Sequence, residues 1–429
     1  MIRIPKITIG RSEGDIEKYG SKKGTGYIGK HLVGDKGEAH VANPIYMDLS
    51  RPHVIGVFGK RGTGKSYSMG TMAEEILKAP ESISNNLSAI IVDPMGIYWS
   101  MKFPNENDTA LLDDWGLKPD AMDVQLYIPE GQAEEFREKD IPYDKTFTIK
   151  PGELSTSDWA MTFDIKLNEP RGILLEKVLR DLEEDYGEDY SLDNMVEYAS
   201  TQGDFKEETR KALKNRFNAA KEWGIFSVEG SELSEFTERG TLTILDLSLF
   251  GAIRGSWSVR SLVVGLLSNK ILRERMSSKR LEEMREMEGM QTSESPIVWM
   301  FIDEAHQFLP NDGETPASDP LLSWVKIGRE PGVSLVLCTQ QPYKLNPDAL
   351  SQCDVVLSHR LTSKADIDAL KNIMQNYMRY DLSTYIDNLP KAKGCAICLD
   401  DNSERVYKLR MRPRVSWHAG GTPTAIKDE

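Results

Sequence analysis

The chain has 429 residues, of which 39% are hydrophobic, with 33 Gly and 21 Pro. This composition excludes wholesale disorder and collagen-like chains, and the length predicts about three domains. The net charge of −14 and the four cysteines argue against a uniformly basic nucleic-acid-binding surface and against a disulfide scaffold. We therefore expect a cytoplasmic protein in a reducing compartment.

The apolar runs along the chain are short. None approaches the roughly 18 residues of a membrane-spanning helix, and the first ten residues contain no apolar signal sequence. We expect neither membrane insertion nor secretion.

The expected elements, taken in chain order, divide the sequence into five parts. Residues 1–50 are Gly-rich and predict a short β-rich segment whose best strand is Val41–Leu49. From residue 51, apolar runs of four to six residues alternate with helical patterns, which predicts an α/β core with a mainly parallel sheet. The core is expected at 51–165 and 241–412, a charged α-helical insertion at 166–240 and a C-terminal tail at 413–429.

A glycine-rich motif follows the first apolar strand of the core. Residues 59–66 fit the pattern G-x-x-x-x-G-K-[ST], with an apolar strand before them and a helical segment after them. Backbone N–H groups of such a loop surround phosphate oxygens, the lysine reaches the β- and γ-phosphates, and the hydroxyl binds Mg²⁺. The residues predicted to bind ATP and Mg²⁺ are Gly59, Lys60, Arg61, Gly62, Thr63, Gly64, Lys65 and Ser66.

Two acidic residues end a later apolar strand. In the segment IVWMFIDEAHQFLP, Asp303 and Glu304 follow a run of apolar residues. An Asp at the carboxyl end of a buried parallel strand can hold the Mg²⁺ shell, and an adjacent Glu can polarise the attacking water, so the pair favours hydrolysis. The letters DEAH also spell a helicase box, but the downstream residues do not fit that class. We expect His306 to be a packed or surface residue.

Polar residues downstream of the acids complete the predicted site. Gln340 ends the next strand, where a polar side chain can contact the γ-phosphate or the attacking water. Arg329 lies just before that strand and could act in trans as an arginine finger on a neighbouring subunit. Taken alone, an Arg in this position is more often a surface ion-pair partner.

Taken together, these motifs resemble those of the HerA-type ATPases, a branch of the HerA–FtsK group of P-loop translocases. The resemblance covers about residues 45–400 and follows the family's order of segments. These segments are GKRGTGKS, IVDPMGIY, KNRFNAAKEWGIF, GTLTILDLS, MFIDEAHQFLP, GREPGVSLVLCTQQP and LSQCDVVLSHRLTSKADIDAL. The last two are the most specific, because generic P-loop proteins do not share them.

The resemblance implies a RecA-like core that assembles as a ring, usually a hexamer, and hydrolyses ATP at subunit interfaces. It implies that double-stranded DNA passes through the pore. By motif position, Arg329 matches the trans finger, Gln340 matches the polar sensor and Arg360 matches a second group that contacts nucleotide. With Glu304, these form the expected catalytic set. Relatives of this kind often work with a nuclease such as NurA or with a defence effector, so DNA repair and antiviral defence are the expected settings.

Two features depart from the family's pattern. Members usually carry a larger N-terminal β-barrel, whereas about fifty residues precede the glycine-rich loop here, so we expect the barrel to be reduced or absent. The family's D-P-x-G-E-Y segment reads DPMGIY at 93–98, without its Glu. Asp93 could therefore either contribute to the site or cap the turn, and both interpretations stay open.

Basic residues outside the motifs also have two interpretations. Alternation in RVYKLRMRPR places Arg410, Arg412 and Arg414 on one strand face. They could contact a phosphate backbone, or they could guard an exposed edge strand. The basic helix at 206–216 could line a pore or be a solvated face.

Two features near the C-terminus give weaker signals. Cys395 and Cys398 form a C-x-x-C pair, but no second ligand pair accompanies them, and the segment is typical of a buried strand. Trp417 and His418 could stack on adenine, although we expect them to pack rather than to bind nucleotide.

From the residues and the resemblance together, we expect an ATP-hydrolysing ring that translocates on or through double-stranded DNA. The acidic balance favours a DNA contact that is confined to a channel. Two alternatives remain open. One is an ATP-responsive ring scaffold that regulates an effector with little translocation, and the other is a secretion or conjugation ATPase of the VirB4 kind.

Overall fold

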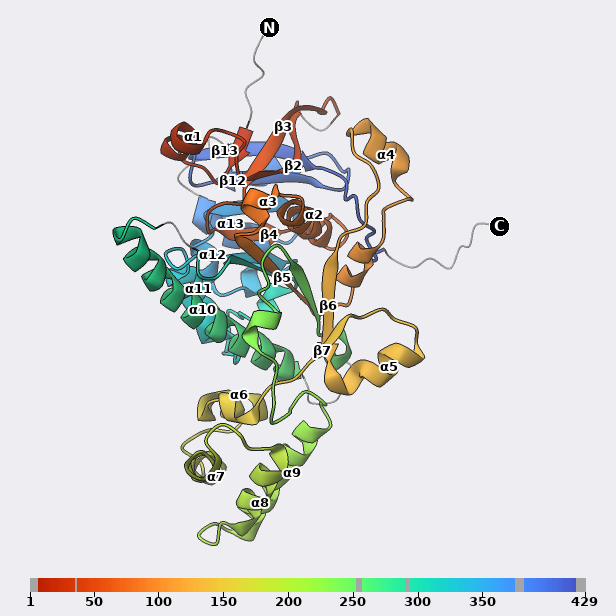
Figure 1. The fold of residues 1–429 in the computed structure, drawn as a ribbon. Helices are drawn as coiled ribbons and strands as arrows, with labels where there is room; N and C mark the ends of the chain where they lie inside the picture. Colours follow the sequence, from red (N-terminus) through yellow and green to blue (C-terminus); the bar gives the residue numbers. More distant parts are fainter. Residues whose placement is uncertain (1–6, 35–36, 252–256, 291–292, 375–381, 422–429) are drawn as a thin grey trace.

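The computed structural model describes residues 7–34, 37–251, 257–290, 293–374 and 382–421. Figure 1 shows helices on both faces of one large sheet and a helical lobe that projects from it at the bottom of the view. The described residues form a 13-stranded sheet with the order β1-β3-β2-β13-β12-β11-β4-β10-β9-β5-β8-β6-β7. The predicted α/β class with a mainly parallel sheet is confirmed.

Eight neighbouring strands run parallel and form the middle and one end of the sheet. In spatial order they are β11 (Val355–His359), β4 (Val54–Phe58), β10 (Val333–Thr339), β9 (Ile297–Ile302), β5 (Leu87–Asp93), β8 (Leu242–Asp246), β6 (Val124–Pro129) and β7 (Lys145–Phe147). Helices cover both faces of a parallel sheet, so its inner strands are apolar on both sides. This explains the continuous apolar runs in the sequence.

Five strands extend the sheet beyond β11. They are β12 (Cys395–Asp400), β13 (Arg405–Met411), β2 (Thr25–Val33), β3 (His40–Asp48) and β1 (Ile7–Ile9). The expected hairpin of β12 and β13 is present, and Cys395 and Cys398 are buried in its first strand. β13 also pairs antiparallel with β2, so the N-terminal strands continue the core sheet. A short helix that the sequence did not predict, α1 (Glu13–Tyr19), precedes β2.

Three helices flank the parallel strands. On one face, α2 (Lys65–Leu77) packs against the sheet through Met69 and Met72. On the other face lie α10 (Trp257–Met287) and α11 (Ser318–Ile327), which contact each other. The other connecting helices are α3 (Glu81–Ser84), α4 (Thr109–Asp114), α5 (Ala133–Glu138), α12 (Pro347–Ser351), α13 (Lys364–Met374) and α14 (Leu382–Asp387).

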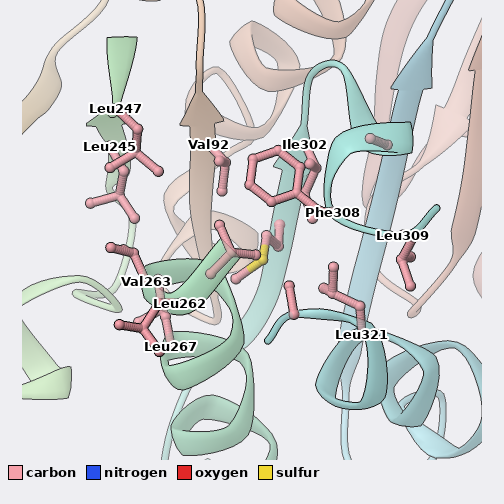
Figure 2. Close-up of a cluster of buried hydrophobic side chains, with 14 of the residues drawn as sticks. Val92, Leu245, Leu247, Leu262, Val263, Leu267, Ile302, Phe308, Leu309 and Leu321 are labelled. Carbon is pink, nitrogen blue, oxygen red and sulfur yellow. The ribbon is translucent and has the colours of Figure 1, made fainter. Parts of the chain in front are cut away.

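An apolar cluster supports the carboxyl ends of three neighbouring strands. Figure 2 shows Val92, Leu245 and Ile302 of β5, β8 and β9 on the same side as Leu262 and Leu267 of α10. Each of the three strand residues is followed directly by an aspartate. These aspartates are Asp93, Asp246 and Asp303. Because side chains alternate across a strand, packing of the apolar residues on α10 turns the carboxylates toward the opposite face, where α2 lies.

The helical lobe comprises α6 (Thr156–Phe163), α7 (Pro170–Tyr186), α8 (Leu192–Thr201) and α9 (Glu207–Lys221). The last three lie within the insertion expected at 166–240. α6 begins earlier, yet it packs into the lobe, since the ring centroid of Trp159 lies 6.0 Å from that of Phe217. Among the described residues, no helix is both long and apolar enough to cross a membrane.

Candidate active site

The glycine-rich loop connects β4 to α2 at the carboxyl edge of the parallel strands. Gly62 and Gly64 have φ values of 78° and 108°, which favour glycine because a side chain is strained there. Gly64 is the N-cap of α2, so the helix begins at Lys65 and its first N–H groups have no acceptor within the helix. The loop therefore presents a helix N-terminus, whose partial positive charge attracts anions such as phosphate.

Contacts within the subunit hold this loop in place. The backbone N–H of Lys60 donates to the carbonyl of Arg360 at 2.9 Å, and the Thr63 hydroxyl donates to the carbonyl of Lys60 at 2.7 Å. Lys65 is buried, and its Nζ donates to the same carbonyl at 3.3 Å. Lys60 and Arg61 are exposed. Arg360 thus lies beside the loop of its own subunit, because β11 is the neighbour of β4.

The order of the strands brings Gln340 and the two acidic residues together. β10 lies between β4 and β9, so Gln340 at its end lies between the loop and Glu304. Gln340 Nε2 donates to Glu304 Oε1 at 3.3 Å. His306 Nδ1 lies 2.9 Å from the Thr339 hydroxyl and 3.5 Å from Glu304 Oε2. Within the described part of the chain, the buried Oε2 of Glu304 has no hydrogen-bond partner, so it is free to accept a proton.

The environment of Glu304 also favours proton acceptance. Burial raises its pKa and Asp303 adds to the increase, whereas Lys65 and Gln340 oppose it. A carboxylate with a raised pKa is a stronger base. Glu304 has a φ of 50°, a left-handed conformation that is uncommon for residues other than glycine and that clusters at functional sites.

Tyr98 links the acids to the loop, a contact that the sequence did not predict. Its side chain is fully buried, and its hydroxyl lies 3.1 Å from Asp303 Oδ2 and 3.2 Å from the carbonyl of Ser66. One phenol oxygen therefore fixes the distance between the strand that carries Asp303 and the helix that carries Ser66. The available signal was a tyrosine five residues after the strand-ending Asp93 in DPMGIY.

Asp93 caps the turn that places Tyr98. Its two carboxylate oxygens accept four backbone N–H groups, at distances from 2.7 to 3.1 Å. The donors are Met95, Gly96, Ile97 and Tyr98. Of the two interpretations left open by the sequence, these contacts support the cap.

Ser66 and Asp303 are the residues predicted to hold a nucleotide-bound Mg²⁺, and the Tyr98 hydroxyl contacts the Ser66 carbonyl and the Asp303 carboxylate. Mg²⁺ usually keeps several waters and takes one or two protein ligands plus phosphate oxygens. The described residues contain no group of three or more His, Cys, Asp or Glu side chains that could hold a metal ion. A metal at Ser66 and Asp303 would therefore depend on the oxygens of the bound triphosphate.

Arg329 lies at the opposite edge of the sheet from these residues. It is exposed and precedes β10, whereas the loop and the acids follow the carboxyl ends of their strands. The seven residues of β10 span roughly 20 Å at about 3.3 Å each. Arg329 therefore cannot reach the loop of its own subunit.

Neither interpretation of the basic strand face holds for Arg412 and Arg414. Both side chains are fully buried and pair with α2. Arg412 lies 2.7 Å from Glu74 and 2.6 Å from Glu75, and Arg414 lies 3.4 Å from Glu74. They cannot contact a phosphate backbone from there, and β13 is not an edge strand. The alternation of side chains in the sequence predicts which arginines share a face. It does not predict that α2 supplies the carboxylates with which they pair.

A family model described as Helicase HerA, central domain, matches residues 27–274, which is more than half of the chain. This chain belongs to the HerA family. The DNA double-strand break repair helicase HerA of Pyrococcus furiosus is 27% identical to it over 135 residues. That match covers 30% of this HerA-family chain and only 24% of the relative's own length.

Solved structures share the fold. VirB4 of Thermoanaerobacter pseudethanolicus aligns with a TM-score of 0.58 at 12% identity, covering 92% of this chain and 98% of VirB4. The bacterial conjugative coupling protein TrwB aligns with a TM-score of 0.50 at 14% identity, covering 87% and 88% of the two chains. By family and by fold, the chain is thus a P-loop NTPase of the HerA–FtsK superfamily with a RecA-like core.

Proposed function

We propose that this chain is the subunit of a ring-shaped ATPase that moves on or through double-stranded DNA. The observation that carries the proposal is the meeting of five predicted residues at one edge of the sheet. They are Lys65, Ser66, Asp303, Glu304 and Gln340. A loop for phosphates, a pair of Mg²⁺ ligands and a base with one free oxygen are the parts that hydrolysis of a nucleoside triphosphate needs.

In the proposed reaction, the loop holds the triphosphate and Lys65 neutralises charge on its β- and γ-phosphates. Mg²⁺, held by Ser66 and Asp303, would add positive charge to the same oxygens. The attacking water gives its proton to Glu304 Oε2, while its oxygen forms a bond to the γ-phosphorus and the bond to the β-phosphate oxygen breaks. Gln340 holds the other oxygen of Glu304 and so fixes the direction of the base.

The position of Arg329 supports a site that is completed by a neighbouring subunit. A charged group that lies at the far edge of its own sheet can serve a loop only in another copy, as in a ring of subunits packed head to tail. We propose a homo-oligomer, with a hexamer as the expected size. Double-stranded DNA in the pore, a NurA-like nuclease or defence effector as partner, and a setting in DNA repair or antiviral defence belong to the same proposal.

Steady-state ATP hydrolysis with and without linear double-stranded DNA tests the proposal. We expect turnover that rises several-fold with DNA and is lost in Glu304→Gln. Glu314→Gln is the matched control, because Glu314 is an exposed residue ten positions further along the chain and loses the same charge.

Two results would contradict the proposal in different ways. Equal turnover in Glu304→Gln and in the wild type would remove the proposed hydrolytic site. Turnover that is lost in Glu304→Gln but indifferent to DNA would keep the ATPase and exclude the DNA motor. The second result would favour a scaffold that regulates an effector, or a secretion ATPase of the VirB4 kind if the protein fractionates with membranes.

A further inference from the structure

A cavity of about 540 Å³ opens beside the glycine-rich loop. Its volume lies within the range of about 300–1,000 Å³ that is typical of small-molecule sites. Gly62, Gly64 and Tyr67 form its wall on the side of the loop, and Gly394 and Met411 form its wall on the side of the hairpin. The hairpin lies beyond β11, whereas Glu304 lies beyond β10, so the cavity and the catalytic base flank the loop on opposite sides.

Aromatic rings line much of this cavity. Tyr67 comes from α2, Trp115 from the segment after α4, and Trp417 and His418 from the segment that follows β13. The rings of Tyr67 and His418 meet edge to face, with their centroids 5.3 Å apart. Flat apolar faces around a cavity of this size suit a flat ligand, because stacking on an aromatic ring stabilises any nucleobase.

The segment with Trp417 and His418 is held firmly against the core. The buried ion pairs of Arg412 and Arg414 with Glu74 attach its start to α2. Further along, the Ser416 hydroxyl donates to Glu74 Oε1 at 2.6 Å, and the backbone N–H of Trp417 donates to the carbonyl of Phe103 at 2.7 Å. The aromatic wall is therefore built in advance and attached to the same helix that begins at the loop.

We propose that this cavity binds the nucleoside part of the nucleotide whose phosphates bind the glycine-rich loop, with the base against Trp417 and His418. This inference rests on the proposed binding of ATP and corrects our expectation that these two residues only pack. The triphosphate would extend from the cavity along the loop toward Glu304.

The charges around the cavity agree with this orientation. Burial, together with Arg414 and Lys393, lowers the pKa of His418 to about 4, so its ring is neutral at neutral pH and suits a base better than a phosphate. Lys393 and Arg410 also line the cavity, where their positive charge attracts the phosphates of a nucleotide. Asp108 also lines it and can accept a hydrogen bond from an exocyclic amino group such as that of adenine.

Inorganic tripolyphosphate carries the phosphates of ATP without its nucleoside. Comparing the two probes therefore separates binding in the cavity from binding at the loop. Both probes would be measured by competition against a fluorescent ATP analogue, in the full chain that carries Glu304→Gln so that ATP is not consumed. We expect Trp417→Ala to weaken ATP binding about tenfold or more, because a lost base–aromatic stack commonly has an effect of this size. Binding of tripolyphosphate should not change.

Tyr186→Ala is the matched control. Tyr186 is 46% exposed and lies at the end of α7 in the helical lobe, outside the cavity. We expect this variant to bind both probes as the parent protein does. If Trp417→Ala unfolds, the wild type still decides the question: ATP, but not tripolyphosphate, should quench tryptophan fluorescence.

The outcomes separate this inference from the proposed function. Equal effects of Trp417→Ala on both probes, or no effect on either, would overturn the nucleoside cavity while ATP binding by the loop stands. In the fluorescence measurement, equal responses to the two probes would overturn it. Failure of the wild type to bind either probe would instead overturn the proposed function on which the inference rests.

Discussion

At the scale of single residues, the proposed base is defined by what each of its two oxygens contacts. Gln340 holds one oxygen of Glu304, and the other oxygen is buried without a hydrogen-bond partner in the described part of the chain. A buried acceptor without a partner carries an energetic cost, so its retention at the end of β9 suggests a role in function rather than in stability. The left-handed backbone at Glu304 supports the same interpretation.

Tyr98 gives the first prediction at this scale. Tyr98→Phe removes the hydroxyl that lies between Asp303 and Ser66 but keeps the ring in the core. We expect kcat to fall about tenfold or more and the Mg²⁺ requirement to rise, because groups that orient metal ligands commonly have effects of this size. ATP hydrolysis measured against Mg²⁺ concentration checks this.

Tyr127→Phe is the control for Tyr98→Phe. The hydroxyl of Tyr127 also bonds to a carbonyl, that of Glu235, but it lies far from the loop in the sheet order. We expect this variant to keep its kcat and its Mg²⁺ requirement. Similar losses in both variants would show that Tyr98 only stabilises the fold.

The sequence predicts the loop and the acids because these residues act through local geometry. Eight consecutive residues form the loop, and Asp303 and Glu304 follow directly on an apolar strand. By contrast, Asp303, the acidic partner of Tyr98, lies more than 200 positions away in the chain, and Glu74, a partner of Arg412, lies more than 300 positions away. Such contacts depend on how the strands are ordered in the sheet, which no local pattern contains.

At the scale of elements, α2 has a different function at each of its two ends. Its N-terminus forms the phosphate site, and Glu74 and Glu75 near its end attach the segment after β13. Burial alone would raise the pKa of Glu74, but Arg412 and Arg414 outweigh burial and lower it. The carboxylate is therefore charged in the folded protein and depends on its arginines.

Arg412→Met tests this attachment. The change leaves the buried carboxylate of Glu74 short of a partner, and breaking one side of a buried ion pair costs about 3–5 kcal/mol. We expect the urea midpoint of unfolding to fall accordingly. Arg405→Met, an exposed position on β13, should change stability by less than about 0.5 kcal/mol. A similar midpoint in the two variants would show that the network does not stabilise the fold.

The elements themselves are only partly predictable from the sequence. Buried parallel strands such as β5 and β10 are recognisable because they are apolar on both faces. α1 was missed because its seven residues lie within a Gly-rich segment, and its N-cap, Ser12, is a weak signal on its own. That β2 pairs with β13, more than 370 positions away, follows from tertiary structure alone.

At the scale of the whole molecule, the N-terminal strands and the core form one body. Buried His53 links them: its Nδ1 lies 2.7 Å from Asp354 Oδ2, beside β11, and its Nε2 lies 3.7 Å from Asp48 Oδ2, at the end of β3. Arg11 lies 2.9 Å from the same Asp48. The described N-terminal segment is therefore attached to the ATPase core by buried charges rather than held on a linker.

The distance between Arg329 and the loop gives a prediction about assembly. If Arg329 completes the site of a neighbour, Arg329→Ala rings and Lys65→Ala rings should each lose about a thousandfold or more of their turnover. Mixed rings, made by co-expression with two tags, contain interfaces where an intact loop faces an intact arginine. In a random equal mixture these are about a quarter of all interfaces of a head-to-tail ring, so we expect turnover up to about a quarter of the wild-type value.

Rings mixed from Lys65→Ala and Glu304→Gln provide the control. Lys65 and Glu304 lie in one site of one subunit, so no interface of this second mixture holds a complete set of groups. We expect it to stay as inactive as its parents. Equal behaviour of the two mixtures would contradict a site shared between subunits, and Arg329 would then be a surface residue without a part in the reaction.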